Sequence, residues 1–288
     1  MKWQGARRSG NVEDKRGMSG GKKLAFGGIG GIIVLIIGFL MGGDPMQLLN
    51  QAQQSGLGST TTQGEYVSSP EEDNLLAFTD VVLASTEDVW SSIFKQSGKN
   101  YPIPKLTVYN GAIETAGCGT GQAHFGPFYC PGDQKIYLDL SFNKELTQKY
   151  GAKGEFALAY VIAHEVGHHI QNVLGVLDQT NALRAKMSER EYNKVSVMTE
   201  LQADFYAGVW AHHLQKQTKI EITYDDILDG MRAAAAVGDD HLQEQAYGKS
   251  NPESFTHGTS EQRVYWFKKG YETGDVNAGN TFGDRSLQ

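Results

Sequence analysis

Two histidines and a glutamate that lie close together in the chain have the types and spacing of a metal site. In the segment AYVIAHEVGHHIQ, His164, Glu165 and His168 follow the pattern His-Glu-x-x-His. Residues four positions apart on an α-helix project from the same face, so the two imidazoles can bind one zinc ion. The intervening glutamate lies beside that ion, where it can act as a general base. The segment therefore predicts a helix that carries two zinc ligands and a catalytic carboxylate.

The third ligand decides which kind of zinc site this is. One known extension of the motif adds a further glycine and histidine, but Gln171 and Leu174 stand at those two positions. The downstream segment MTELQADFYAGVWAHH offers Glu200 and Asp204 instead, again four positions apart on a predicted helix. Glu200 can complete a set of three protein ligands and leave a fourth position open for water. Asp204 can accept the second ring N–H of a ligand histidine and so fix its tautomer.

A site of this kind also needs a group that stabilises negative charge in the transition state. His257, in the segment SFTHGTSEQR, is the leading candidate for this catalytic role, with Arg263 and Tyr206 as alternatives. The competing interpretation of Arg263 is an ion pair that holds the last helix to the domain. The remaining histidines are interpreted as structural or solvated groups: His124, His169, His212, His213 and His241.

Cys118 and Cys130 are the only cysteines, and they lie in a loop rich in glycine and aromatic residues. Buried free thiols and metal ligands are the alternative interpretations. A disulfide is favoured if this part of the chain lies outside the cytoplasm. Closing so short a loop would contribute about 3 kcal/mol to stability in the chain-entropy model.

The N-terminal part of the chain has the pattern of a membrane anchor. Residues 24–43 contain no charge and are long enough for a helix that crosses a bilayer. A cleaved secretory signal and a buried core helix are the alternatives. The basic residues that precede this stretch predict a cytoplasmic leader, residues 1–23, by the positive-inside rule.

The rest of the domain organisation follows from that orientation. Residues 44–70 are polar and rich in Ser, Thr, Gln and Gly, which predicts a flexible linker. The zinc-binding domain is expected over residues 71–288. A single pass through the inner (cytoplasmic) membrane would place this domain on the periplasmic or extracellular side.

The overall charge argues against nucleic acid as a partner. The formal net charge is −7, whereas phosphate binding needs clustered Lys and Arg. We therefore expect two partners, a peptide or protein substrate and the lipid bilayer contacted by residues 24–43.

Hydrophobic periodicity predicts a domain of the α+β class. Strands are expected at 105–109 and 135–142, the second from the alternating segment KIYLDLSF. The predicted helices are 72–97, 154–174, 188–217, 224–247 and 259–272. The expected fold is thus a mostly helical domain with a small β-sheet, preceded by one transmembrane helix.

In combination, these motifs resemble the bacterial neutral zinc metallopeptidase family and, more distantly, the gluzincin peptidases. The resemblance rests on MKWQGARRSGNVEDKRG, one anchor, CG…GPFYCPGDQKIYLDLSF, HEVGHHIQ, ELQADFYAG and HGTSEQR, and it covers nearly the whole chain. It implies a zincin-like domain with one Zn²⁺ per chain. It also implies His164, His168 and Glu200 as ligands and Glu165 as the catalytic base. Asp204 would be the residue that hydrogen-bonds to a ligand histidine without touching the metal.

The expected activity is hydrolysis of peptide bonds by a zinc-bound water that Glu165 activates. A catalytically silent envelope scaffold that keeps the zinc and the fold is the alternative, and the intact Glu165 argues against it because a structural zinc needs no base. In gluzincins an edge strand near the zinc pairs with the substrate backbone. The strand 135–142 is the candidate for that part.

Overall fold

The computed structural model describes residues 1–18, 66–122, 126–148, 151–152 and 154–288. The predicted anchor, residues 24–43, and the predicted linker up to residue 65 lie outside these ranges. Within the described ranges no helix combines the length and the apolar character needed to cross a bilayer.

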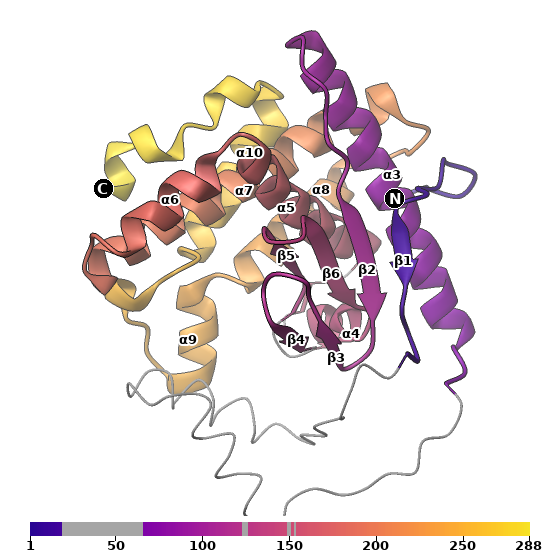
Figure 1. Ribbon diagram of the computed structural model, residues 1–288, viewed down its shortest axis with the longest axis horizontal. Coiled ribbons are helices and arrows are strands. Elements are labelled where there is room, and N and C mark those ends of the chain that lie inside the picture. The colour runs from indigo at the N-terminus through magenta and orange to yellow at the C-terminus, as the bar shows by residue number, and fades with distance from the viewer. Residues whose placement is uncertain (19–65, 123–125, 149–150, 153) are drawn as a thin grey trace, which may run out of the picture.

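Four strands form the main sheet, in the spatial order β1-β2-β6-β5. β1, β2 and β6 run parallel, and β5 pairs antiparallel with β6. A separate two-stranded hairpin, β3 and β4, lies near the end of this sheet (Figure 1). The strands are β1 (Val12–Asp14), β2 (Lys105–Tyr109), β3 (Ala112–Glu114), β4 (Thr120–Gln122), β5 (Phe128–Cys130) and β6 (Lys135–Asp139).

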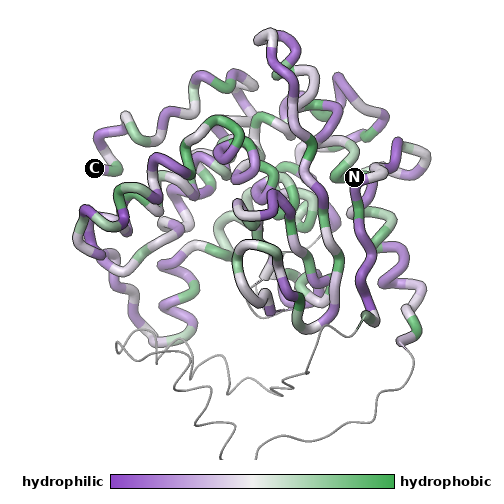
Figure 2. Tube along the Cα trace, in the orientation of Figure 1, coloured by the Kyte–Doolittle hydropathy of each residue, from purple (hydrophilic) through white to green (hydrophobic). Residues whose placement is uncertain are grey.

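Eight α-helices are described, and α5 lies at the centre of them (Figure 1). The hydrophobic segments of Figure 2 gather on this helix and on the strands beside it. α5 packs against α3, α7 and α8, and α7 packs along α10. The helices are α3 (Pro70–Gln96), α4 (Phe142–Gln148), α5 (Glu155–Val173), α6 (Val176–Arg184), α7 (Glu189–Gln217), α8 (Tyr224–Ala236), α9 (Asp239–Tyr247) and α10 (Ser260–Thr273).

Local sequence accounts for where several helices begin. In a capping box, a Ser or Thr side chain accepts the N3 backbone N–H while the N3 side chain accepts from the cap. α3, α7, α8 and α10 each begin with this reciprocal pair. The capping pairs are Ser69 with Glu72, Ser188 with Glu191, Thr223 with Asp226, and Thr259 with Gln262.

The observed domain is mostly helical with a small sheet, as predicted, but two of the predicted elements differ in extent. Six short elements were not predicted: β1, β3, β4, β5, α4 and α6. The predicted helix 224–247 is divided at Gly238, which lies so close to Ser260 that a side chain there would overlap its backbone nitrogen. The predicted strand 135–142 ends at Asp139, because this carboxylate accepts the backbone N–H of Ser141, 2.9 Å away, and turns the chain into α4.

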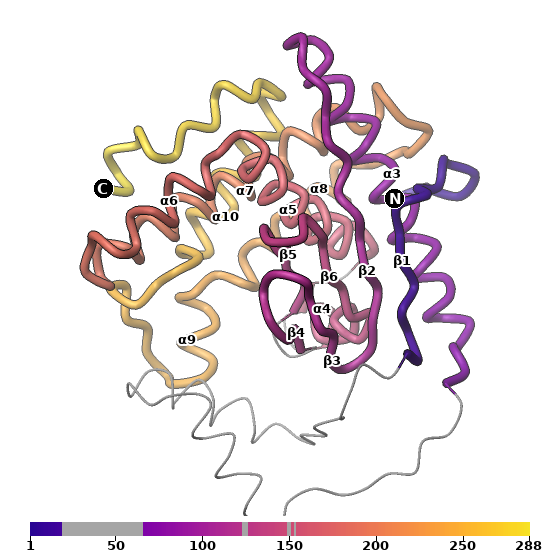
Figure 3. Tube along the Cα trace, viewed as in Figure 1, coloured from indigo at the N-terminus to yellow at the C-terminus, as the bar shows by residue number. Residues whose placement is uncertain are grey.

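Residues 1–18 form part of the folded domain, which corrects the predicted boundaries. β1 completes one edge of the main sheet, and Figure 3 shows it beside β2 and α3. Trp3 is 5% exposed and packs edge-on against Phe78 of α3. The prediction separated 1–23 from a domain at 71–288 because it interpreted the basic residues as a topology signal. The carboxylates that pair with these basic residues lie too far along the chain to be recognised from local patterns.

Candidate metal centre

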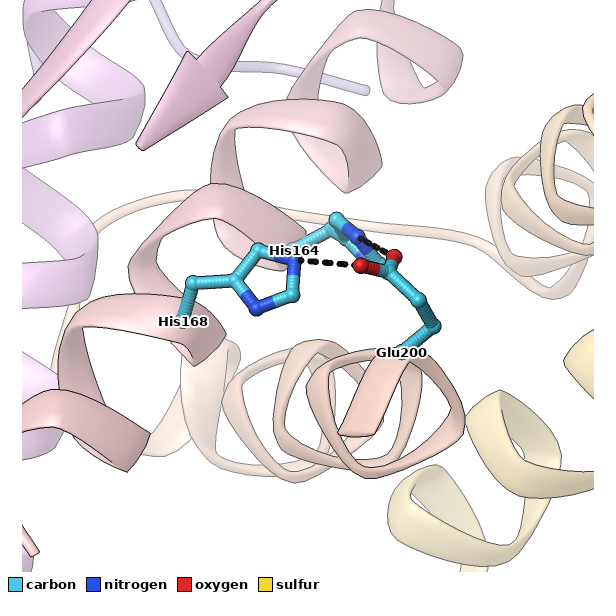
Figure 4. Close-up of side chains that lie close together, drawn as sticks. All are labelled: His164, His168 and Glu200. Atoms are coloured by element: carbon cyan, nitrogen blue, oxygen red, sulfur yellow. Dashed lines mark hydrogen bonds and ion pairs between the residues drawn. The ribbon is translucent and has the colours of Figure 1, made fainter. Parts of the chain in front are cut away.

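His164, His168 and Glu200 direct one ligand atom each toward a common point. The two histidines come from α5 and the glutamate from α7, and Figure 4 shows both imidazoles facing the carboxylate. Nε2 of His164 lies 3.2 Å from Oε2 of Glu200, and Nε2 of His168 lies 3.4 Å from Oε1. The three candidate ligand atoms lie within 4.8 Å of one another. The structure thus brings the three predicted ligands together.

A glycine inside the histidine motif allows the two helices to approach. A Cβ at Gly167 would lie 2.8 Å from the carbonyl oxygen of Ala203 on α7, closer than real Cβ atoms are found to other atoms. Glycine is the residue that permits such close backbone contact. Because Glu200 lies one turn before Ala203, this contact places its carboxylate against the two imidazoles.

The other ring nitrogens of the two histidines are bound to oxygen atoms. Nδ1 of His164 lies 2.7 Å from Oδ1 of Asp204, and Nδ1 of His168 lies 2.8 Å from Oε1 of Gln171. An acceptor at Nδ1 holds the proton there and leaves the Nε2 lone pair for a metal. Burial raises the pKa of Glu200, but His168 and His164 outweigh this effect and hold it well below its usual range. Two imidazole nitrogens and one carboxylate suit zinc.

Behind His164, a buried ion pair joins α7 to α10. Nε of Arg263 donates to Oδ2 of Asp204 at 2.8 Å, and its NH2 group donates to Oδ1 at 3.0 Å. The hydroxyl of Tyr160 donates to the same carboxylate at 2.5 Å. The Asp204 side chain is fully buried. Burial raises its pKa, but Arg263 and His164 outweigh this and lower it to about 2. The ionised form of Asp204 is therefore favoured, and both of its oxygens can accept hydrogen bonds.

Arg263 thus forms an ion pair that holds α10 to the domain, which was the competing interpretation of this residue. It lines the cavity described below, but its guanidinium is engaged by Asp204. This argues against a role as a free oxyanion donor. Tyr206 is 5% exposed and packs edge-on against Trp90. It does not line that cavity.

Glu165 follows His164 on α5, and its carboxylate faces the same cavity. Glu165 is only 7% exposed, and this burial is the main effect that raises the pKa of its carboxylate. The backbone of Tyr129 on β5 offsets a small part of this rise. A carboxylate with a raised pKa accepts a proton more readily than a solvated one. Its chemical environment therefore suits a general base.

A cavity of about 530 Å³ opens over these groups. Its lining includes residues of β5, α4 and α6, several of them apolar, together with the candidate ligands. This volume is within the range of sites that hold small organic ligands. The residues that line it include Phe128, Tyr129, Phe142, Val161, Leu177, Leu242 and His257.

The strand at the cavity is β5, and this corrects the candidate edge strand. β6, which covers most of the predicted strand 135–142, is paired on both sides by β2 and β5. β5 forms the end of the sheet, and Tyr129 at its centre lines the cavity. The predicted Cys118–Cys130 disulfide is present and ties the β3–β4 hairpin to the last residue of β5.

His257 lines the same cavity with a side chain that is 50% exposed. Its Nδ1 lies 3.2 Å from Oδ1 of Asp239, whose Oδ2 accepts the His257 backbone N–H at 2.6 Å. Asp239 was not predicted as a site residue. Its position in an acidic run at the start of a helix is typical of an ordinary helix terminus, and no local pattern distinguishes it. With the proton on Nδ1 held by Asp239, Nε2 of His257 can donate to a ligand when the ring is in its doubly protonated, cationic form.

Where they are described, the histidines interpreted as structural do not belong to the group of candidate ligands. Nδ1 of His169 is 3.0 Å from the hydroxyl of Tyr129, and its Nε2 is 2.6 Å from the carbonyl oxygen of Pro102. His212 and His213 bind backbone carbonyl oxygens near the end of α10. His124 lies outside the described residues.

Comparison with known proteins identifies relatives along nearly the whole chain. The family model described as "Putative neutral zinc metallopeptidase" matches residues 1–282. "Uncharacterized protein YpfJ" of Escherichia coli (strain K12) is 46% identical over 289 residues, which cover 98% of this chain and 99% of that protein. "Uncharacterized protein Rv2575" of Mycobacterium tuberculosis (strain H37Rv) is 42% identical over 212 residues, 70% of this chain and 69% of that protein. No solved structure matches the chain at a significant level.

Proposed function

The chain belongs to the neutral zinc metallopeptidase family, and we propose that it is an active zinc peptidase in which His164, His168 and Glu200 hold the metal. The observation that carries this proposal is the orientation of the imidazoles, whose Nε2 atoms face Glu200 while acceptor oxygens hold Nδ1. A base with a raised pKa and an open cavity adjoin this group. A zinc site that served the fold alone would need neither.

The proposed chemistry divides between the metal and the side chains around it. A bound zinc ion supplies Lewis-acid polarisation of the peptide carbonyl and lowers the pKa of a coordinated water toward 7. Glu165 accepts a proton from the attacking water and passes it to the departing amine. His257 donates from Nε2 to the carbonyl oxygen as negative charge develops there.

An extended substrate backbone has a place to bind beside these groups. β5 is the end strand of the sheet and borders the cavity that contains Glu165. A peptide added at such an edge pairs through its main chain. The apolar side chains around the cavity, among them Phe142 and Leu177, favour hydrophobic residues next to the cleaved bond. β5 thus takes the place of the strand 135–142 as the proposed edge strand for substrate pairing.

The domain is proposed to act outside the cytoplasm. The support is the Cys118–Cys130 disulfide, because such bonds persist in oxidising compartments and are rare in the cytosol. Substrates at or near the outer face of the cytoplasmic membrane follow from this location, if residues 24–43 enter the bilayer.

Zinc content and proteolysis of the full chain test the proposed function. We expect one zinc per chain, cleavage of casein or a peptide library, loss of cleavage after 1,10-phenanthroline, and recovery on addition of zinc. His164→Ala should lose both zinc and activity. The matched control is His213→Ala, which removes a histidine that hydrogen-bonds to a backbone carbonyl outside the candidate ligand group and should keep both. Zinc without cleavage of any substrate would favour the silent scaffold, and absence of zinc would refute the metal site.

His257→Ala is expected to lower kcat by about 10²- to 10³-fold, as the loss of one oxyanion donor does, with zinc content unchanged. Burial lowers the pKa of His257, but Asp239 and the charge of Glu200 outweigh this and raise it. A raised pKa keeps the donor protonated to higher pH, so activity is present below that pKa and is lost as the pH rises through it. Asp239→Asn should therefore move the alkaline limb of kcat/KM to lower pH.

His241→Ala serves as the control for this pair, because His241 lies on α9 beside Asp239 in sequence but does not line the cavity. Its rate and pH profile should match those of the unaltered chain. If Asp239→Asn lowers the rate without moving the alkaline limb, Asp239 only shapes the loop and does not act through the imidazole.

A further inference from the structure

The N-terminal segment, residues 1–18, raises a question about membrane topology. We propose that this segment and the metal centre lie on the same side of any membrane that the apolar stretch 24–43 enters. A single crossing would instead place them on opposite sides. The inference does not depend on peptidase activity. It rests on three independent sets of contacts between the segment and the domain.

The first set is a shared sheet. Val12 pairs with Leu106 and Asp14 with Val108 in the parallel β1–β2 ladder. The backbone N–H of Leu106 donates to the carbonyl oxygen of Asn11 at 3.0 Å, and that of Lys15 donates to Val108 at 2.8 Å. Adjacent strands of a sheet lie about 5 Å apart, whereas the hydrocarbon layer of a bilayer is about 30 Å thick. A strand and its neighbour therefore share a compartment.

The second set is a buried carboxylate whose described partners come from the segment. Glu87 of α3 is 4% exposed. It accepts hydrogen bonds from the hydroxyl of Ser9, from Nδ2 of Asn11 at 2.9 Å and from NH2 of Arg7 at 2.8 Å. A buried carboxylate without partners is strongly unfavourable. The interior of the domain is thus built to receive residues 7–11.

The third set reaches the helix that carries the metal ligands. The indole N–H of Trp3 donates to Oε2 of Glu155, the first residue of α5, at 3.0 Å. The Trp3 ring is buried against Phe78. The segment is therefore fixed to both α3 and α5.

Two of the basic residues that suggested a cytoplasmic leader form ion pairs with the domain. Arg7 pairs with Glu87 and Asp88 at 2.8 Å, and Arg16 pairs with Asp73 at 3.0 Å. The positive-inside rule applies to charges that remain free to hold a loop in the cytoplasm. Guanidinium groups bound to carboxylates of the domain carry much less of that signal.

The chain also leaves and re-enters the domain at one place. Gly17 lies against Tyr66, so closely that a Cβ on the glycine would overlap the tyrosine ring. The ion pair between Arg16 and Asp73 joins the same two parts of the chain. Both ends of the stretch between residues 18 and 66 therefore emerge from the same part of the domain, as sharing one side of a membrane requires.

Cysteine labelling in the full chain tests this topology. Gln4→Cys and Lys186→Cys, made separately, place a thiol at exposed positions of the segment and of the metal-binding domain. The native cysteines are joined in the disulfide and do not react. Each variant is labelled with a membrane-impermeant maleimide in cells whose cytoplasmic membrane is intact, and again after permeabilisation. Unchanged zinc content verifies that each variant is folded.

We expect the ratio of labelling before and after permeabilisation to be the same at the two positions. A ratio near one at both supports the inference and the proposed location outside the cytoplasm. Protection of both until permeabilisation supports the shared side but refutes that location. Labelling of Lys186→Cys with protection of Gln4→Cys would overturn the inference and establish a single crossing.

Discussion

Replacing Glu165 with glutamine is expected to lower kcat by about 10²- to 10⁴-fold, the usual contribution of a general base, while zinc stays bound. Glutamine has nearly the same shape as glutamate. The amide cannot take a proton from water. The ligand atoms on His164, His168 and Glu200 are unaltered by this change. The measurement is kcat on a peptide substrate together with zinc content by atomic spectroscopy.

Glu261→Gln is the matched control, since Glu261 is an exposed residue in the first turn of α10 and does not line the cavity. It should retain full activity. If Glu165→Gln kept the activity of the control with zinc in place, the proton would have to move through another group and the assigned role of Glu165 would be wrong.

Arg263→Ala is expected to lower the free energy of unfolding by about 3–5 kcal/mol, because it leaves the fully buried Asp204 carboxylate without its cation. Asp204 also orients His164 through Nδ1. Loss of such a supporting contact typically weakens metal affinity by about 10- to 100-fold. The variant should therefore bind zinc more weakly as well as unfold more easily. Denaturant unfolding of the metal-free chain and a zinc titration measure the two effects separately.

Arg190→Ala provides the comparison for that prediction. Arg190 pairs with Glu253 at 2.9 Å, but both side chains are more than half exposed. Exposed pairs contribute about 0.2–1 kcal/mol, so this variant should be nearly neutral. Equal destabilisation by the two substitutions would mean that water or local rearrangement compensates Asp204, and the ion pair would not be the link between α10 and the metal centre.

The candidate ligand group could be predicted from sequence because each half of it is local. His164 and His168 are one helical turn apart, and so are Glu200 and Asp204, so periodicity alone places each pair on one face. Only the meeting of the two helices is a long-range event. Its local sign is Gly167, which allows α5 to touch α7 at Ala203. A single glycine in a helix has several possible explanations, so this contact was not predictable.

The parts that were missed depend on contacts between distant residues. β5 has three residues in a loop rich in glycine and proline, too few to show an alternating pattern. β1 is equally short and is a strand only because β2 lies beside it. Asp239 is indistinguishable from any acidic residue at a helix start until His257 is placed against it. Arg7 and Arg16 were interpreted as topology signals because their carboxylate partners are remote in sequence.

The docking of the N-terminal segment also has a consequence for how the chain folds during synthesis. The ammonium group of Lys2 binds a glutamate 219 residues further on, and the indole of Trp3 binds one 152 residues further on. At about 5–20 residues per second, a ribosome needs roughly 10–45 s to make the 219 residues between the first pair. Contacts of such long range form late. The first residues to be translated are therefore among the last to reach their final positions, and they stay accessible to chaperones and translocation factors until then.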